Sequence, residues 1–274
     1  MNKKLYNLVL HSRRIQLEVN NHLKDKKIKV PVHLAIGHEY VAALVKYNFI
    51  PKNDKIILTH RNIHYTSLFS KNPKKIYLEF ANKNIDKLKT FGSMNYYEKN
   101  SDIAYTSSIL GNNFSVACGV AKALKKKKGI TICTTGDGAI EEGSFYESLL
   151  LAKYLELPII FLIENNDWSM GTTIKERRSQ IKLDKLASSL NIQYFNFKRN
   201  NFQKNFKTYK KVVQKCRKYR TPFICEFEVR TEGSYKKNNN VVKYHHGPMK
   251  LEMKNKFLLK DYKNDILYKI SGKK

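Results

Sequence analysis

The chain has 274 residues, of which 42% are hydrophobic and 12% aromatic, so it can bury a full core and is not a disordered chain. Its formal net charge is +29, but 43 of the 52 basic residues are lysines spread along the chain and nine are arginines. Recognition of phosphates and bases favours the planar fork of arginine. The charge therefore argues against a nucleic-acid-binding protein and indicates a solvated surface or attraction to an acidic partner subunit.

The four cysteines form no CxxC pair, and Cys133 and Cys225 lie in apolar, strand-like runs. This placement predicts buried thiols in a reducing compartment and argues against metal ligands or disulfides. The apolar run at 5–10 is too short for a signal peptide, and no stretch approaches the roughly 20 apolar residues that span a bilayer. We therefore expect a soluble, cytoplasmic protein that does not enter a membrane.

The N-terminal part shows helical spacing, one short strand and a polar region. In chain order we expect a helix at 1–23, a helical pattern at 34–50, a strand at 54–59 and a polar helix and loop at 71–100.

The central part alternates between helices and strands. Helices are expected at 114–128, 141–155, 179–190 and 205–220, strands at 130–135, 159–163, 192–197 and 223–229, and loops at 233–243 and after 250. This alternation predicts an α/β fold with a parallel sheet covered by helices on both faces. We expect a single domain over 1–274, with its core at about 30–235 and a peripheral segment at about 236–274.

Two of the expected strands end in polar clusters. Gly136-Asp137-Gly138 follows the strand at 130–135, and Glu164-Asn165-Asn166 follows the strand at 159–163. One helix connects the two strands, and such a unit returns right-handed and usually places its strands side by side. Both clusters should then lie at the carboxyl edge of the sheet, where open α/β sheets bind ligands.

The residue types in these clusters suit a hard cation. Asp137 offers a charged oxygen, Asn166 a neutral carbonyl oxygen, and the backbone carbonyl of Trp168 a third. Mg²⁺ prefers oxygen ligands in an octahedron and shares them with phosphates and water. The pattern therefore predicts a site for Mg²⁺ and a phosphate group.

The glycines and the following helix suit the phosphate. Gly136 and Gly138 are expected to allow a sharp turn and close approach of the ligand. A helix starting near Ala139 would direct its free N–H groups at the phosphates. Glu141 and Glu142 are interpreted as acidic residues that favour this helix N-terminus.

The segment GDGAIEEGSFYESLLLAKYLELPIIFLIENNDWSMGT resembles the thiamine diphosphate motif, GDG followed by NN at this spacing. More narrowly, it resembles the alpha subunit of the first component of 2-oxo acid dehydrogenase complexes, and it is similar to relatives encoded with cell-surface sugar pathways. Three upstream segments, IGHEYVAALV (36–45), HRNIHY (60–65) and SSILGNNFSVACGVAKAL (107–124), resemble family segments too. The resemblance covers roughly residues 30–235.

The resemblance implies a thiamine diphosphate-binding fold and an enzyme that uses thiamine diphosphate and Mg²⁺. It implies Asp137, Asn166 and the Trp168 carbonyl as metal ligands. The cofactor-binding residues that it implies are Arg61, Ser108, Leu110, Gly136, Asp137, Gly138, Ala139 and Asn166.

The resemblance also implies a partner and a substrate class. A pyrimidine-binding beta subunit would supply the carboxylate that faces the pyrimidine nitrogen, in an α₂β₂ assembly. The substrate would be a 2-oxo acid or a sugar-derived carbonyl compound, with decarboxylation and acyl or aldehyde transfer. A lipoyl carrier remains open as a further partner.

The chain departs from the family at its histidines. The family's GGSMH reads GSMN here, so Asn95 stands where an imidazole is expected, and Ser234 stands at a second histidine position. His245 or His246 would replace the second histidine if the loop is longer, and His64 lies one place off the usual pattern. We take His64 and His246 as the candidate catalytic residues.

Three alternatives remain open. The N-terminal half of a split transketolase tends to carry D-x-N where this chain has Glu164-Asn165-Asn166, which favours the dehydrogenase-like interpretation. A module for another phosphate-bearing ligand would be expected to show GxGxxG or GxxxxGK[ST], and neither occurs. A nucleic-acid-binding protein would bind with a steep salt dependence.

Overall fold

The computed structural model describes residues 2–74, 98–237, 240–243 and 246–271. The chain divides into two compact units. Unit 1 comprises Met1–Tyr47, His60–Ser101 and Arg230–Lys274, and unit 2 comprises Asn48–Thr59 and Asp102–Val229.

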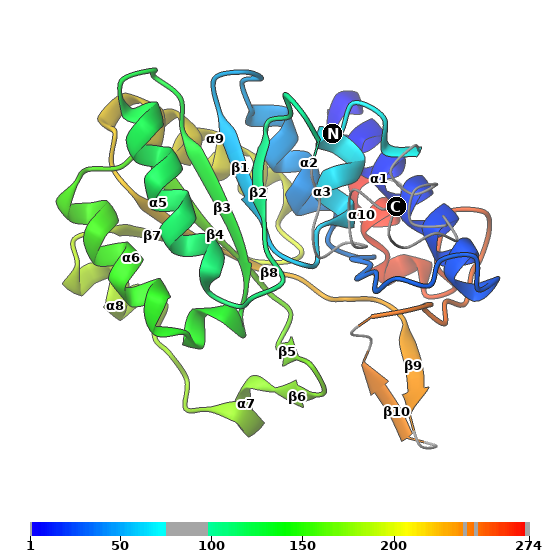
Figure 1. Cartoon of the computed structure of the whole chain (residues 1–274). Helices are drawn as coiled ribbons and strands as arrows, with labels where there is room; N and C mark the ends of the chain where they lie inside the picture. The colour runs from blue at the N-terminus through cyan, green and yellow to red at the C-terminus, as the bar shows by residue number, and fades with distance from the viewer. Residues whose placement is uncertain (1, 75–97, 238–239, 244–245, 272–274) are drawn as a thin grey trace. The chain divides into compact units, whose positions relative to one another are not determined.

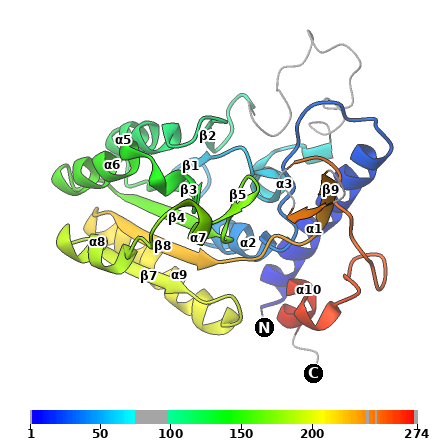
Figure 2. The same ribbon diagram turned by 90° about the horizontal axis from the view of Figure 1, so that it is seen from below.

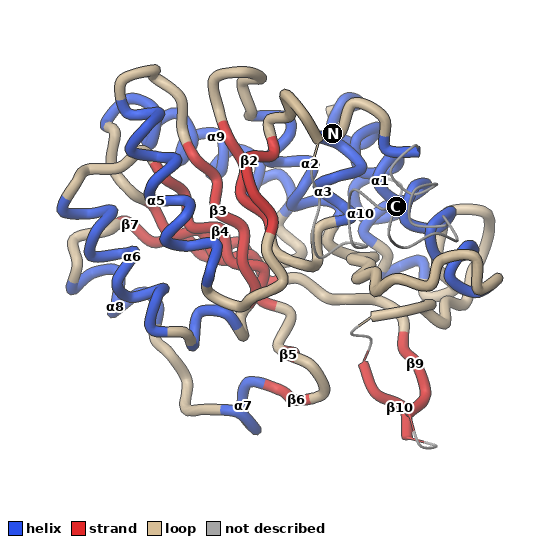
Figure 3. Tube along the Cα trace, in the orientation of Figure 1, coloured by secondary structure: helices blue, strands red, loops and turns tan. Residues whose placement is uncertain are grey.

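Unit 2 is built on a six-stranded sheet in the order β2-β1-β3-β4-β8-β7 (Figures 1 and 3). Every neighbouring pair in this sheet is parallel. Its strands are β1 (Lys55–Leu58), β2 (Ile103–Thr106), β3 (Thr131–Gly136), β4 (Ile159–Asn165), β7 (Gln193–Phe197) and β8 (Phe223–Glu228). The central strands β3 and β4 are almost wholly buried, because a parallel sheet with helices on both faces exposes neither face to water.

Helices cover both faces of this sheet (Figure 2). They are α5 (Asn112–Lys125), α6 (Gly143–Tyr154), α8 (Leu183–Ser189) and α9 (Phe202–Tyr219). On one face, Phe114 of α5 and Phe145 of α6 pack on Phe161 of β4, with ring centroids 5.1 to 6.3 Å apart. On the other, Tyr209 of α9 packs on Phe227 of β8 at 5.7 Å. The expected parallel sheet with helices on both faces is confirmed.

Unit 1 is mainly helical. It contains α1 (Lys3–Lys24), α2 (Glu39–Asn48), α3 (Ile63–Phe69), the antiparallel pair β9 (Ser234–Lys237) and β10 (Asn240–Lys243), η3 (Tyr262–Asn264) and α10 (Ile266–Ser271). A buried ion triad joins these elements, since Arg13 of α1 donates to Glu39 of α2 at 2.6 Å and to Asp265 at 2.9 Å. The C-terminal part therefore contributes a buried charge to this unit.

Several sequence-based boundaries differ from the structure. The helical pattern at 34–50 becomes helical only at Glu39, and the helix expected from 179 begins at Leu183. The loop expected at 233–243 contains β9 and β10, and the sequence did not reveal β2 or α3. The helix and loop expected at 71–100 lie mostly outside the described residues.

The four cysteines are free and buried, as expected from the apolar runs around Cys133 and Cys225. In the part of the chain that the structure describes, no helix is long and apolar enough to span a bilayer.

Candidate functional site

The two polar clusters meet at the carboxyl edge of the sheet of unit 2. Strands β3 and β4 are adjacent and in register, with Gly136 opposite Glu164. Asp137 and Asn166 follow directly, and the N–H of Asn166 donates to Oδ1 of Asp137 at 3.3 Å. The expected juxtaposition of the two loop tips is therefore confirmed.

The loop after β4 is shaped by its own asparagines. The N–H of Asp167 donates to the side chain of Asn165, and the N–H of Trp168 donates to that of Asn166, each at 3.0 Å. Asp167 adopts a left-handed conformation with φ of 66°. Asparagine favours such turns because its side chain can bond the backbone two residues on. This turn holds Asn166 beside Asp137.

A small hairpin and one helical turn continue the loop. They are β5 (Trp168–Ser169), β6 (Thr172–Thr173) and α7 (Ile174–Arg177). The carboxylate of Glu176 accepts from both the N–H and the hydroxyl of Thr173 at 2.7 Å, which fixes the start of α7. The hairpin and α7 thus place Arg177, the last residue of α7, at the sheet edge.

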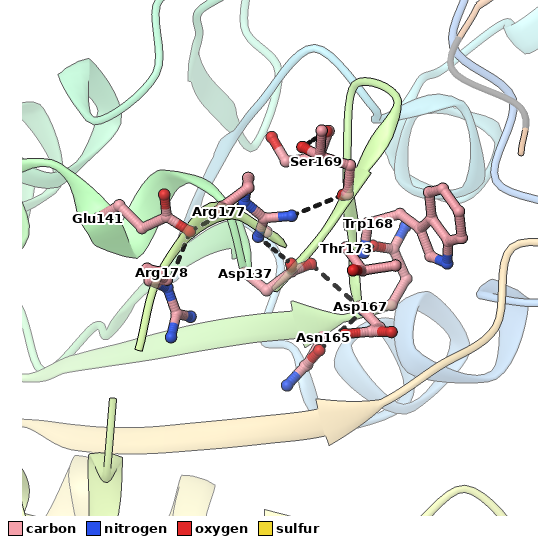
Figure 4. Close-up of polar contacts among 12 residues, drawn as sticks. Asp137, Glu141, Asn165, Asp167, Trp168, Ser169, Thr173, Arg177 and Arg178 are labelled. Carbon is pink, nitrogen blue, oxygen red and sulfur yellow. Dashed lines mark hydrogen bonds and ion pairs between the residues drawn. The ribbon is translucent and has the colours of Figure 1, made fainter. Parts of the chain in front are cut away.

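Arg177 forms an ion pair with Asp137 that the sequence did not reveal. Its Nη2 lies 2.8 Å from Oδ2 of Asp137, its Nε lies 3.1 Å from Oε1 of Glu141, and its Nη1 donates to the Thr172 carbonyl at 2.8 Å. Figure 4 shows the contacts of Arg177 with Asp137 and Glu141. Arg178 also binds Glu141, at 2.8 Å. Glu141, expected only to favour a helix N-terminus, thus binds two arginines.

The Asp137 carboxylate is buried, which favours binding of a cation to it. Its side chain is only 2% exposed. Burial raises the pKa of the Asp137 carboxyl, and the hydrogen bond and positive charge of Arg177 oppose that rise. A buried carboxylate gains most from a cation placed directly on it.

The two glycines around Asp137 have different roles. Gly138 has helical φ and ψ angles of −73° and −36°. Any residue can adopt these angles, so the expected sharp turn does not explain the glycine at this position. A Cβ at Gly138 would lie 2.5 Å from Oγ of Ser169, so close packing of the β5–β6 hairpin excludes a side chain. A Cβ at Gly136 would meet no atom within 4 Å, which leaves open space beside Asp137.

The segment expected to start a phosphate-binding helix is more irregular than predicted. Ala139–Glu141 forms a single 3-10 turn (η2), and the α-helix α6 begins only at Gly143. Glu142 connects the two and has an extended backbone. The backbone of Ala139 therefore belongs to a tight turn next to Asp137 and does not start an α-helix.

Ser108 and Leu110 lie in the turn between β2 and α5. Both side chains are exposed, and the hydroxyl of the neighbouring Ser107 accepts from the N–H of Ile109 at 3.1 Å. The turn follows the carboxyl end of β2. Its position at that end of a strand agrees with the expected ligand-binding edge.

The remaining candidates belong to unit 1. Arg61 donates to the Leu34 carbonyl. His64 is buried in α3, and its ring centroid lies 5.7 Å from that of His38.

His246 is exposed, and its ring centroid lies 5.7 Å from that of His33, which in turn lies 4.7 Å from His60. Ser234 begins β9, while Asn95 and His245 lie outside the described residues.

An open cavity of about 1280 Å³ adjoins the turn after β4. Its lining includes Asn166, Arg177, Tyr194 and Glu226. The carboxylate of Glu226 accepts from Asn165 at 2.7 Å and also from the hydroxyl of Tyr194. Burial raises the pKa of the Tyr194 phenol, and the hydrogen bond to Glu226 raises it further. The tyrosine that lines this part of the cavity is therefore neutral.

The donor set suits a divalent cation bound to a phosphate. The buried carboxylate of Asp137 accepts a hydrogen bond from the backbone of Asn166 at the ends of two parallel strands, and the amide oxygen of Asn166 lies in the same turn, where it accepts from the N–H of Trp168. Hard oxygen ligands of this kind suit Mg²⁺. The residues present therefore fit the expected metal and diphosphate.

The chain is similar in sequence to known proteins. The sequence matches the family described as dehydrogenase E1 component over residues 8–267. It is 29% identical to the pyruvate dehydrogenase E1 component subunit alpha of Rickettsia typhi over 197 residues, which cover 71% of this chain and 60% of that relative. It is 33% identical to the mitochondrial type II alpha subunit of Ascaris suum over 164 residues, covering 59% and 41%. The chain thus spans about 60% of the length of the first relative.

The fold is similar to that of a transketolase from Campylobacter jejuni. The TM-score is 0.61 and the sequence identity 15%, and the similarity covers 90% of this chain and 41% of that chain. At this identity the likeness concerns the fold alone.

Proposed function

Because the chain belongs to the dehydrogenase E1 component family, we propose that it is the alpha subunit of a thiamine diphosphate-dependent enzyme. It acts on a 2-oxo acid or a related carbonyl compound, by decarboxylation and acyl or aldehyde transfer, and it binds the Mg-diphosphate of the cofactor. Relatives named as alpha subunits of the pyruvate dehydrogenase E1 component support this assignment.

One observation carries the proposal. The buried carboxylate of Asp137 and the amide of Asn166 meet at the carboxyl edge of a parallel sheet, joined by a backbone hydrogen bond of 3.3 Å. The same edge carries open space at Gly136. This arrangement supports a site for a metal-bound diphosphate, since such a site requires oxygen ligands that converge and a backbone that approaches the phosphates closely.

We assign the residues of the site as follows. Asp137, Asn166 and the Trp168 carbonyl hold the metal ion. The cofactor is bound by Arg61, Ser108, Leu110, Gly136, Asp137, Gly138, Ala139 and Asn166. When bound, thiamine diphosphate supplies the stabilisation of a carbanion at the reacting carbonyl carbon.

His64 and His246 are assigned as the catalytic residues. A histidine can hold or move a proton near neutral pH, which is the role proposed for both side chains toward the substrate. The burial of His64 suits a fixed proton donor or acceptor, whereas the exposure of His246 suits a group that meets incoming substrate.

The proposed enzyme requires a beta subunit. This partner binds the pyrimidine end of the cofactor, and we propose an α₂β₂ assembly. A lipoyl carrier is the proposed acceptor if the product is an acyl group. The four buried, free cysteines support a reducing compartment, and we place the protein in the cytoplasm.

Calorimetry with thiamine diphosphate and Mg²⁺, with the beta subunit present, tests the proposal. We expect saturable binding that requires Mg²⁺ and is lost in Asp137→Asn. Cofactor binding that is unchanged in this variant would contradict the assigned site.

A product assay tests the reaction class. We expect turnover of a 2-oxo acid with an electron acceptor. Turnover of a ketose donor with an aldose acceptor, without 2-oxo acid turnover, would instead identify half of a transketolase.

A further inference from the structure

Arg177 binds the carboxylate to which we assign the metal ion. Its guanidinium lies 2.8 Å from Oδ2 of Asp137, and the Arg177 side chain is 12% exposed. We propose that Arg177 is an internal competitor of the divalent cation, which occupies Asp137 in the cofactor-free chain and leaves when the cation binds. This inference rests on the proposed function and concerns regulation of the same site.

The Arg177 guanidinium is held in place by three acceptors. Its donors contact two carboxylates, those of Asp137 and Glu141, and one backbone carbonyl, that of Thr172. Planar arginine matches such a set of acceptors better than a point charge would. The guanidinium therefore compensates the negative charge of Asp137.

A metal ion and Arg177 compete for the negative charge of this carboxylate. Both carry positive charge, and both need an oxygen of Asp137 at bonding distance. Two like charges on one buried carboxylate repel strongly, because solvent screens them poorly. Binding of a divalent cation at Asp137 thus weakens the hold of Arg177 on this carboxylate and favours its departure.

The release of Arg177 would affect the loop after β4, because Asp137 contacts both the start and the end of this loop. Oδ1 of Asp137 accepts from the N–H of Asn166 at the start of the loop, and Oδ2 binds Arg177 at its end. The hairpin β5–β6 lies between these two contacts. Exchange of Arg177 for a cation therefore frees one end of the loop while Asn166 remains at the site.

The loop contains a tryptophan that can report cation binding and a second arginine that can serve as a control for loss of charge. Trp168, the only tryptophan, lies in this loop two residues after Asn166. Arg178 carries the same charge as Arg177, but it binds Glu141 at 2.8 Å and the Ser179 carbonyl at 3.0 Å. Substitution of Arg178 therefore removes an equal charge from the same turn without freeing Asp137.

Titration of the full chain with Tb³⁺ alone tests the competition. Tb³⁺ is a hard cation that prefers oxygen ligands, and nearby Trp168 sensitises its luminescence. We expect Arg177→Gln to bind Tb³⁺ more tightly than the wild type by about tenfold, as expected for loss of a partly buried competing ion pair. Arg178→Gln should change the affinity by less than about threefold, and Asp137→Asn should abolish the sensitised signal.

Equal affinities of Arg177→Gln and the wild type would overturn the proposal, as would equal tightening in Arg178→Gln. Circular dichroism checks that each variant folds. If Arg177→Gln does not fold, Arg177→Lys decides, because it keeps a charge and loses the planar fork. Tighter Tb³⁺ binding by Arg177→Lys than by the wild type supports competition, and equal or weaker binding overturns it.

A parallel titration with Mg²⁺ and thiamine diphosphate separates this inference from the proposed function. If the cofactor fails to bind to the wild type and to Arg177→Gln while the Tb³⁺ differences persist, the proposed function fails and the competition stands. If the cofactor binds but Arg177→Gln changes neither affinity, the competition fails and the proposed function stands.

Discussion

The N–H of Asn166 donates to Oδ1 of Asp137 across 3.3 Å and joins the loop after β3 to the loop after β4. The two residues are 29 positions apart in the chain, and the adjacent parallel strands bring them together. Since the bond uses the backbone of Asn166, the side-chain oxygen of Asn166 can be removed without removing this contact. The Asn166 side chain also accepts from the N–H of Trp168, so its ligand role is tested beside a control variant in the same turn.

Asn166→Ala tests the ligand role of the Asn166 side chain. We expect Mg²⁺-dependent binding of thiamine diphosphate to weaken by at least about tenfold, because one oxygen ligand is lost. Calorimetry of the full chain with its beta subunit provides the measurement.

Asn165→Ala is the matched control for Asn166→Ala. Asn165 shapes the same turn and binds Glu226, but it has no assigned role at the metal ion. A loss of cofactor affinity in Asn165→Ala as large as that in Asn166→Ala would show that the turn, and not the ligand, matters.

Gly138→Ala should destabilise the loop at the site. The new Cβ would lie 2.5 Å from Oγ and 2.8 Å from Cβ of Ser169, so the hairpin must shift. We expect the free energy of unfolding to fall by about 1–3 kcal/mol, as for other overpacked positions. Chemical denaturation of the variant and the wild type measures this difference.

Two further variants make this prediction specific. Gly136→Ala places its Cβ in open space and should cost much less than Gly138→Ala. Ser169→Gly should restore most of the stability lost in Gly138→Ala, since it removes both close atoms. An equal loss in Gly136→Ala, or no rescue by Ser169→Gly, is incompatible with the close-packing explanation.

Arg13→Met should destabilise unit 1 severely. Burial lowers the pKa of Arg13, but the carboxylates of Glu39 and Asp265 more than compensate and keep this pKa raised. Removal of the guanidinium leaves two buried carboxylates without their cation, which costs about 3–5 kcal/mol. Thermal unfolding measures the loss.

Arg14→Met controls for the loss of an arginine from α1. Arg14 is exposed and lies over the ring of Phe257 at 4.7 Å. A cation–π contact of this kind contributes about 0.5–1 kcal/mol. Comparable destabilisation by the two substitutions would argue against the buried triad as an organising contact.

The cysteines should resist labelling in the folded protein. Burial raises the pKa of Cys118 to about 11, although a hydrogen bond to Ser148 opposes this rise. Burial likewise raises the pKa values of Cys133, Cys216 and Cys225. Because the thiolate is the reactive form, a thiol reagent at pH 8 should label the native chain slowly and all four cysteines in denaturant.

The same pKa shifts imply a pH dependence of stability. A thiol of the unfolded chain ionises near pH 8.5, whereas burial raises the pKa of folded Cys118 to about 11. The stability contributed by the neutral thiol is complete below about pH 8.5 and is lost as the pH rises toward 11. Stability that rises between pH 8.5 and 10 would contradict buried thiols, provided that Cys118→Ala removes that rise.

The sequence predicted the central strands and the meeting of their polar ends for physical reasons. β3 is rich in β-branched residues, and β4 begins with five apolar residues. One helix joins the two strands, and such units place their strands side by side. Asp137 and Asn166 had to follow at one edge. Local pattern and the handedness of the connection were therefore enough to locate the centre of the site.

Arg177 could not be predicted in the same way. It reaches Asp137 across 40 positions, from a helical turn of four residues that is too short to show periodicity. The edge strand β2 has only four residues, and the loop of β9 and β10 is rich in lysine and asparagine, so neither shows a clear strand pattern. The sequence did contain one indication of α7. Thr173 is followed three positions later by Glu176, and this pattern is a capping box, which is typical of a helix N-terminus.

A crystal structure of the full chain with thiamine diphosphate and Mn²⁺, recorded at an anomalous wavelength of manganese, tests the central claim most directly. We predict one anomalous peak within bonding distance of the Asp137 carboxylate and the Asn166 amide oxygen, with the cofactor diphosphate on the same ion. Bound cofactor whose metal ion contacts neither Asp137 nor Asn166 would contradict the account.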